Sequence, residues 1–257
     1  NSKAWGFRRE MYKRVDFVVC SNAYTQEWTK EWIGGDPRKV VECIPPLNFK
    51  IADGIPPQEE KHEIVFISRM IDYKRPLDIL EIAIRVDPTL TVNYIGAHSA
   101  LNKKVFEVAR RKGIRINFYD AIAEEEKFKI IKQSKFMVFP SRFEGYGLPP
   151  GEALYCKKPC VAYDIPVLKN NYKDMLEFAE ERNTLDLCEK AKRLLDDPEY
   201  RKRRGEEGRE FIKDRLSFEA CEKSYMPIMP PVRISFFIIV FEGDDYLEAC
   251  LKQLYPH

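Results

Sequence analysis

The stretch from residue 63 to residue 96 reads EIVFISRMIDYKRPLDILEIAIRVDPTLTVNYIG, and its pattern decides the class of fold. Residues 63–68 and 90–96 are short runs rich in β-branched and aromatic side chains, which predicts two strands. Residues 77–85 carry apolar side chains at helical spacing, which predicts an amphipathic helix between them. A strand, a helix and a second strand in this order indicate a parallel βαβ unit.

The same alternation continues to residue 163. Further strands are predicted at residues 114–119, 135–140 and 159–163, and further helices at residues 101–112, 124–133 and 151–156. We therefore predict an α/β fold with a Rossmann-like parallel sheet that carries helices on both faces. Such sheets bind ligands beyond the carboxyl ends of their strands. The loops after Ser68, Gly96, Tyr119 and Pro140 are therefore where a site is expected.

The flanking segments set the predicted domain boundaries. Residues 1–46, with strands expected at 15–20 and 39–43 and a helix at 25–32, are interpreted as the tail of a preceding Rossmann-like domain. The proline-containing residues 47–62 are interpreted as a linker, and residues 63–225 as the main domain, which is mostly helical after residue 183. Residues 226–257 are interpreted as a second linker and the truncated start of another βα domain. We expect the chain to be a piece of a longer polypeptide.

Composition narrows the function. The 43 Lys and Arg nearly balance the 41 Asp and Glu, which argues against nucleic acid as a partner. The basic run at residues 201–204 is interpreted as a solvated helix face, with a binding patch as the alternative. No apolar stretch is long enough to cross a membrane. The seven cysteines form no Cys-x-x-Cys pair, so we expect reduced thiols and a cytoplasmic location.

The loop after residue 140 offers one set of candidate site residues. Residues 141–154 read SRFEGYGLPPGEAL, and Gly145 and Gly147 let the backbone approach a ligand just before a helix N-terminus that favours anions. Glu144 and Glu152, with seven residues between them, would repel a phosphate and suit the hydroxyl groups of a sugar or ribose. The alternative is a turn followed by an acidic residue that stabilises the start of a helix.

The loop after residue 68 offers a second set. Arg69 and Lys74 lie between the end of a strand and the start of a helix, where the helix dipole disfavours cations. An anionic ligand would compensate, and an arginine fork with a lysine point charge suits a diphosphate. The alternative is a pair of surface charges on an exposed loop. Because this first turn has no glycine, NAD binding is disfavoured.

Together the two loops resemble a known family. Residues 140–153, PSRFEGYGLPPGEA, match the pattern Pro-Ser-x-x-Glu-Gly-[Phe/Tyr]-Gly-Leu-Pro-x-x-Glu-Ala of retaining GT-B glycosyltransferases of family 4, and Arg69 and Lys74 match that family's Arg–Lys pair. Ser68 and Arg75 stand where the family usually has glycines. The resemblance covers residues 15–225 and implies the C-terminal, donor-binding half of a two-domain GT-B enzyme.

The resemblance also implies roles for the matching residues. Arg69 and Lys74 would neutralise the diphosphate of a nucleotide-sugar, and Glu144 would hold a hydroxyl of the donor sugar; these are the expected catalytic residues. Glu152 would accept hydrogen bonds from the ribose hydroxyls. The remaining contacts to the nucleotide-sugar would come from the backbone or side chains of Gly145, Tyr146, Gly147, Leu148 and Ile122.

The activity implied is the transfer of a sugar, with retention of its anomeric configuration, from a nucleotide-diphosphate donor to a glycan or lipid-linked acceptor. Mannose is a candidate sugar, because GDP-mannose is a common donor in the family. No metal or other cofactor and no protein partner are expected, and peripheral association with the inner face of the cell membrane is typical of the family. We expect the isolated chain to be inactive, because the acceptor-binding domain precedes it in the family.

Two alternatives use the same nucleotide-sugar. The chain could be a binding module without activity, or a GT-B epimerase, which would produce an epimer without any acceptor. A bare α/β interaction scaffold would require both anion loops to be accidental. Separately, residues 233–256 resemble the start of a family 2 glycosyltransferase domain, with an unrelated βα unit as the alternative.

Overall fold

The computed structural model describes residues 12, 14–34, 36–97 and 99–228. The chain divides into two compact units, residues 1–224 and residues 225–257. The segment that resembles the start of a family 2 glycosyltransferase domain, residues 233–256, lies outside the described residues, as does most of the predicted truncated βα domain.

The centre of the first unit is a parallel sheet with six strands in the order β5-β4-β3-β6-β7-β8. The strands are β3 (Glu63–Ile67), β4 (Thr91–Ile95), β5 (Arg115–Tyr119), β6 (Phe136–Phe139), β7 (Cys160–Tyr163) and β8 (Glu177–Ala179). Every residue of β6 and β7 is buried, as are all but the first residues of β3 and β4. Burial on both faces explains why these strands read as unbroken apolar runs. The predicted parallel α/β fold is confirmed.

The strand order contains a switch point between β3 and β6. From β3 the chain moves outward to β4 and β5, and it then returns to place β6 on the other side of β3. The connections on the two sides therefore leave in opposite directions, and sheets of this kind bind ligands beyond the carboxyl ends of the strands at such a point. The loop with Arg69 and Lys74 follows β3, and the loop with Glu144 follows β6.

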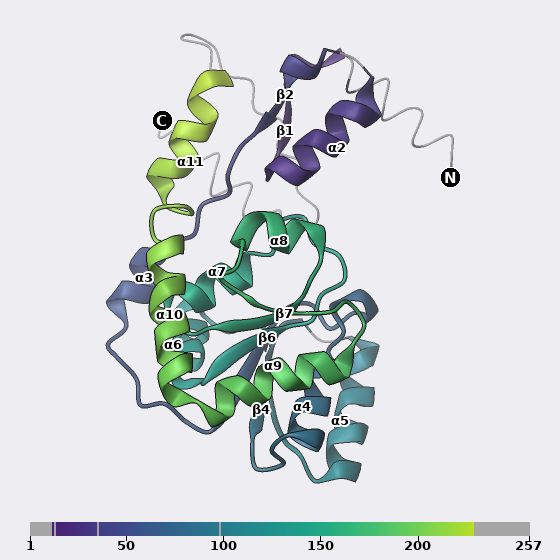
Figure 1. Cartoon of the computed structure of the whole chain (residues 1–257), viewed down its shortest axis with the longest axis vertical. Helices are drawn as coiled ribbons and strands as arrows, with labels where there is room; N and C mark the ends of the chain where they lie inside the picture. Colours follow the sequence, from purple (N-terminus) through teal and green to yellow (C-terminus); the bar gives the residue numbers. More distant parts are fainter. Residues whose placement is uncertain (1–11, 13, 35, 98, 229–257) are drawn as a thin grey trace. The chain divides into compact units, whose positions relative to one another are not determined.

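Helices cover both faces of the sheet, as predicted (Figure 1). One face carries α4 (Asp78–Arg85), α5 (Ala100–Lys112) and α9 (Thr184–Asp196). The other carries α6 (Glu124–Gln133) and α7 (Leu148–Tyr155), with α10 (Pro198–Ile212) packed against α7. Helix α7 begins three residues before the predicted position. Its first turn accommodates Pro149 and Pro150 because the N–H groups there have no partner within the helix.

Two elements between residues 163 and 183 were not predicted. Helix α8 (Pro166–Tyr172) has seven residues and strand β8 has three, so neither is long enough to show a clear period. The mostly helical segment predicted after residue 183 is confirmed as α9, α10 and α11 (Phe218–Tyr225), which is followed by the 3₁₀ turn η3 (Met226–Ile228).

The segment predicted as a linker at residues 47–62 packs against the main domain. It contains α3 (Phe49–Gly54), and Phe49 stacks on Tyr155 with ring centroids 3.7 Å apart. Lys132 of α6 donates to the carbonyl oxygens of Ala52 and Ile55. Apolar residues show no clear period in this segment because it consists of a short helix and turns. The segment nevertheless contributes side chains to the hydrophobic core. The domain boundaries themselves stay a prediction.

Residues before this segment form a small sheet. Strands β1 (Val18–Cys20) and β2 (Val40–Glu42) pair in parallel and are shorter than the predicted strands. Helix α2 (Ala23–Ile33) connects them, followed by the 3₁₀ turn η1 (Pro37–Lys39). The α2 helix starts at an N-cap, Asn22, which accepts a hydrogen bond from the Thr25 N–H.

The interpretation of residues 201–204 as a solvated face was wrong for two of its residues. Arg201 is buried and binds Glu60 and the Leu194 carbonyl oxygen. Arg204 binds Glu177 at the edge of β8. These cations face inward because α10 packs against α7 and α9, which the charge run in the sequence does not reveal.

Six of the seven cysteines lie among the described residues. Cys20, Cys43, Cys156, Cys160 and Cys188 are buried and unpaired, and Cys221 is half-buried and unpaired. Within the residues that the structure describes, no helix has the length and apolar character that a membrane span requires.

Candidate functional site

Three loops meet at the carboxyl edge of the sheet, where the site was predicted. The loop after β3 is joined to the loop after β6 by a backbone hydrogen bond in which the Arg142 N–H donates to the Tyr73 carbonyl oxygen over 2.9 Å. After β4, the Ser99 hydroxyl donates to the Met70 carbonyl oxygen. The two sequence motifs, far apart in the chain, therefore lie side by side.

Two predicted residues form a buried ion pair across these loops. Lys74 ends the 3₁₀ turn η2 (Asp72–Lys74), and its Nζ lies 2.5 Å from Glu144 Oε1, with side chains only 10% and 9% exposed. The rings of Tyr73 and Phe139 lie 5.3 and 5.7 Å from the ammonium group, within reach of cation–π attraction. Both residues were predicted individually, but their direct pairing was not.

Arg75 explains one departure from the resembled motif. Its backbone is left-handed, with φ 54° and ψ 48°, a conformation that glycine adopts without strain. Arginine lacks this freedom, but its side chain is held in place because the guanidinium donates two hydrogen bonds to Asp78, at 3.0 and 3.1 Å. The Tyr163 hydroxyl donates to the same carboxylate over 2.7 Å. This network fixes the turn that leads from η2 into α4.

Arg69 lies on the exposed rim of the site. Its Nη2 donates to the Tyr73 hydroxyl over 2.8 Å, which orients the guanidinium. The Tyr73 ring meets Phe143 edge-on, with centroids 6.2 Å apart, and Phe143 is 71% exposed. Tyr73 was not predicted as a site residue, yet it contacts both predicted cations and the loop after β6. No sequence signal distinguishes it from the other tyrosines of the chain.

The glycine turn at residues 145–147 is fixed by hydrogen bonds that its carbonyl oxygens accept. Asn22 (2.5 Å) and Ser21 (3.1 Å) donate to Gly145, Asn171 (2.9 Å) to Tyr146, and Tyr172 (2.5 Å) to Gly147. In a trans peptide the N–H points opposite to the preceding C=O. The N–H groups of residues 146, 147 and 148 therefore point away from these partners, which leaves them oriented to receive an anion.

The turn requires glycine at one position. Gly147 has φ 82°, and a Cβ there would lie 2.5 Å from Leu168 Cδ2. Tyr172 braces the same turn, because burial raises the pKa of its phenol well above the usual value and keeps it protonated as a donor. Its oxygen also accepts from the Gly151 N–H over 3.1 Å.

The N-terminus of α7 offers fewer donors than the sequence suggested. An α-helix leaves its first four N–H groups without partners in the helix. In α7 two of these positions are prolines, and the Gly151 N–H is bound to Tyr172. Leu148 is the one of the four whose N–H remains for a ligand. The glycine turn, rather than the helix itself, therefore supplies most of the donors.

Glu152 has a partner that sequence reasoning missed. Lys127 of α6 places Nζ 2.7 Å from Glu152 Oε1 and 2.7 Å from Glu124 Oε2. Burial raises the pKa of Glu152, opposed by the Lys127 charge. For Lys127, burial acts to lower the pKa, but the charge of Glu152 and hydrogen bonds to both carboxylates outweigh it and raise the pKa. Nothing in the sequence singles out Lys127 among the charges of its helix.

The loop after β5 holds the last predicted residue. Ile122 is half-buried and packs against the core, and the preceding Ala121 has a left-handed backbone with φ 49°. The structure shows the packing role of Ile122; a contact with a nucleotide base stays a prediction.

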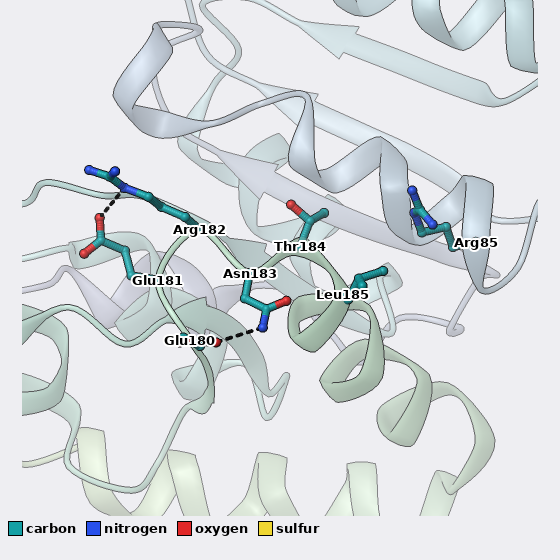
Figure 2. A pocket seen from close by; sticks show the side chains of 7 residues that line it. All are labelled: Arg85, Glu180, Glu181, Arg182, Asn183, Thr184 and Leu185. Atoms are coloured by element: carbon teal, nitrogen blue, oxygen red, sulfur yellow. Dashed lines mark hydrogen bonds and ion pairs between the residues drawn. The ribbon is translucent and has the colours of Figure 1, made fainter.

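Other features lie away from this edge. Figure 2 shows an open pocket lined by Arg85 and residues 180–185, in which Glu181 pairs with Arg182 and the Asn183 side chain donates to Glu180. None of the predicted site residues lines it. In the part of the chain that the structure describes, no group of three His, Cys, Asp or Glu side chains is arranged to hold a metal ion.

A parallel sheet whose switch point gathers two cations, two carboxylates and a glycine turn defines a Rossmann-like ligand-binding domain. The model of the family "Glycosyl transferases group 1" matches residues 49–211, and the chain belongs to this family. The match begins at Phe49, the first residue of α3, which agrees with the packing of that helix on the domain.

Two curated relatives are similar over part of their length. An uncharacterized glycosyltransferase from Methanocaldococcus jannaschii is 30% identical over 161 residues, covering 61% of this chain and 44% of that protein. The poly(ribitol-phosphate) alpha-N-acetylglucosaminyltransferase of Staphylococcus aureus is 25% identical over 189 residues, covering 70% of this chain and 38% of that protein. The chain thus spans less than half the length of each.

Solved structures share the fold at low identity. Sucrose-phosphate synthase from Thermosynechococcus elongatus has a TM-score of 0.76 at 16% identity, covering 89% of this chain and 61% of that one. S. aureus TarM in a complex with UDP has a TM-score of 0.76 at 20% identity, covering 88% of this chain and 46% of that one. Anabaena HepE with UDP and glucose has a TM-score of 0.78 at 12% identity, covering 89% of this chain and 67% of that one. These likenesses support the GT-B type of α/β fold.

Proposed function

We propose that this chain is the donor-binding half of a retaining family 4 glycosyltransferase and that it binds a nucleotide-diphosphate sugar at the switch point. The observation that carries the proposal is that both carboxylates of the Glu144–Glu152 motif lie at one sheet edge, each with a buried lysine partner. Glu144 holds a hydroxyl of the donor sugar, and Glu152 accepts from the ribose.

The charges of the site suit a diphosphate. The Lys74–Glu144 pair is neutral in sum, so Glu144 does not repel an approaching anion as a bare carboxylate would, and Lys127 offsets part of the charge of Glu152 and Glu124. A lysine ammonium has three donors, and Glu144 engages one of those on Lys74, which leaves others for phosphate oxygens. Arg69 adds an exposed cation, and the N–H groups of the glycine turn add aligned dipoles.

These groups stabilise the leaving phosphate. As the bond between the anomeric carbon and the phosphate oxygen breaks, its electron pair passes to that oxygen, and Arg69 and Lys74 lie where the charge develops. The acceptor hydroxyl oxygen then bonds to the anomeric carbon with retention of configuration, and its proton passes to the oxygen of the released diphosphate. Preorganised donors of this kind typically contribute a factor of about 10² to 10³ each in rate. The proposal assigns this work to protein cations, so activity should persist in the presence of EDTA.

The acceptor is proposed to be a glycan or a lipid-linked sugar in the cytoplasm or at the inner membrane face, bound by a domain that precedes this one. The structures named above include complexes with UDP, so UDP-sugars are the first donors to test, with GDP-mannose as the alternative.

The test is to measure binding and turnover of UDP-glucose, UDP-N-acetylglucosamine and GDP-mannose, in this chain and in a longer polypeptide that contains it. Transfer to an acceptor, or slow donor hydrolysis, by the longer polypeptide supports the proposal. Binding without turnover there favours a non-catalytic module, and an epimer formed without acceptor favours an epimerase. Failure of every donor to bind overturns the proposal.

A further inference from the structure

The ion pair between Lys127 and Glu152 connects two helices across the site. Lys127 lies in the first turn of α6 and Glu152 in α7, and both side chains are 11% exposed. Lys127 also binds Glu124, whose side chain is 52% exposed. Lys127 is thus shared between the buried carboxylate of Glu152 and the more exposed carboxylate of Glu124.

Only one oxygen of Glu152 is engaged. Lys127 bonds Oε1, and no partner is found for Oε2 among the described residues. No described side-chain oxygen is fully buried without a partner, so Oε2 reaches solvent. Glu152 therefore presents one free carboxylate oxygen at the edge of the site, held in orientation by the bond to its other oxygen.

Lys127 is also the cation on which this arrangement depends. The titratable groups that face Glu152 are Lys127 and Glu124 of α6, Cys156 of α7 and Tyr172 of α8. Of these, only Lys127 is cationic. A buried carboxylate without a cation becomes protonated or destabilises the fold, and a protonated carboxyl is a poorer acceptor.

We propose that Lys127 is a positioning residue, which keeps Glu152 ionised and aims its free oxygen at the ribose hydroxyls, and thereby sets the preference for ribonucleotides over dideoxyribonucleotides. The inference rests on the proposed function, because it presumes a nucleotide in the site. Lys127 itself need not touch the nucleotide. Hydrogen bonds to a charged acceptor are strong enough to give a preference of about tenfold or more.

The experiment measures the dissociation constants of UDP and 2′,3′-dideoxy-UDP by calorimetry in the wild-type chain and three variants. Lys127→Met removes the charge and keeps most of the volume, while Lys127→Arg keeps the charge. Lys129→Met is the matched control, since Lys129 lies on the same helix with its side chain 48% exposed.

We expect wild type and Lys129→Met to bind UDP at least about tenfold more tightly than the dideoxy analogue. Lys127→Met should reduce this ratio to about twofold or less with little change for the analogue, and Lys127→Arg should restore most of it. If Lys127→Met does not fold, Lys127→Gln replaces it with the same expectation.

The outcomes distinguish a failure of the role of Lys127 from a failure of the proposed function. A folded Lys127 variant without charge that keeps the wild-type ratio overturns the inference and leaves the proposed function standing. Equal binding of both nucleotides by wild type also overturns it, because Glu152 then does not read the ribose. A third outcome is that wild type binds neither UDP nor its dideoxy analogue, and binds none of GDP, ADP and their dideoxy analogues either. In that case the proposed function fails, and the inference fails with it.

Discussion

Lys74 Nζ lies 2.5 Å from Glu144 Oε1, although the two residues are 70 positions apart in the chain. The contact exists because β3 and β6 are neighbours at the switch point of the sheet, so that the loops that follow them lie side by side at its carboxyl edge. Each charge is buried and needs the other. The ion pair therefore links the two loops, and it places a cation and a carboxylate next to each other at the carboxyl edge of the sheet.

The first prediction concerns the stability of this pair. Lys74→Met should lower the free energy of unfolding by about 3 kcal/mol, because it leaves Glu144 buried without a cation. In the double variant with Glu144→Gln the loss should be clearly smaller than the sum of the two single losses. Urea unfolding of all four proteins measures the coupling. Strictly additive losses would show that the two residues do not interact.

A second prediction separates binding from folding. Arg69 is exposed, and among the described residues its side chain is bonded only to Tyr73, so Arg69→Ala should change the free energy of unfolding by less than about 0.5 kcal/mol. The same variant should bind UDP at least about tenfold more weakly while binding uridine equally well, since the lost donor is aimed at phosphate. Arg182→Ala is the control, because the Arg182 side chain is 69% exposed in the pocket of Figure 2. Equal losses for UDP and uridine would contradict the assignment.

A third prediction follows from Glu60, which pairs with Lys158 at 3.0 Å, Arg201 at 2.8 Å and Lys135 at 3.3 Å. Burial acts to raise its pKa, but these cations outweigh burial and lower the pKa below the usual 4.5. A carboxyl whose pKa is lower in the folded state stabilises the fold above the unfolded pKa, and that stability is lost as the pH falls through the folded pKa.

The variant Glu60→Gln tests this dependence. It should be less stable than wild type by about 1 kcal/mol at neutral pH, and the difference should shrink as the pH falls below about 4.5. Thermal unfolding from neutral to acidic pH measures it. A difference that does not change with pH would mean that the Glu60 charge contributes nothing.

A fourth prediction tests the packing of α10. A Cβ on Gly205 would lie 2.0 Å from the Lys157 carbonyl oxygen, and backbone cannot move aside as a side chain can. Gly205→Ala should therefore destabilise the fold by about 2 kcal/mol or more, despite the better helix propensity of alanine. Gly54→Ala, where a Cβ meets nothing within 4 Å, should be neutral. Equal unfolding midpoints for the two variants would contradict the close approach.

The sequence was sufficient for the features that depend on long or distinctive local patterns. The apolar runs of β3, β6 and β7 predicted buried parallel strands, and the helices between them were placed within a few residues. The loops that carry Lys74 and Glu144 could be placed at one edge of the sheet because parallel strands end there together.

What could not be predicted depends on three-dimensional packing. The pairing of Lys127 with Glu152 follows from the way α6 and α7 lie against each other, which no local spacing encodes. Helix α8 and strand β8 are too short for periodicity, and they are fixed by contacts with the glycine turn and with β7. The left-handed backbone of Arg75 was visible in the sequence only as an unusual residue at that position.

The proposed function requires that the loops at the switch point of the sheet bind a nucleoside diphosphate. Calorimetric titration of the chain with UDP, GDP and ADP, alongside the double variant Arg69→Ala/Glu152→Gln, tests it most directly. We expect wild type to bind one of the three nucleotides and the variant, still folded, to bind it about 100-fold more weakly or not at all. A folded wild-type chain that binds none of them, or a variant that binds as tightly as wild type, would show that these loops are not a nucleotide site.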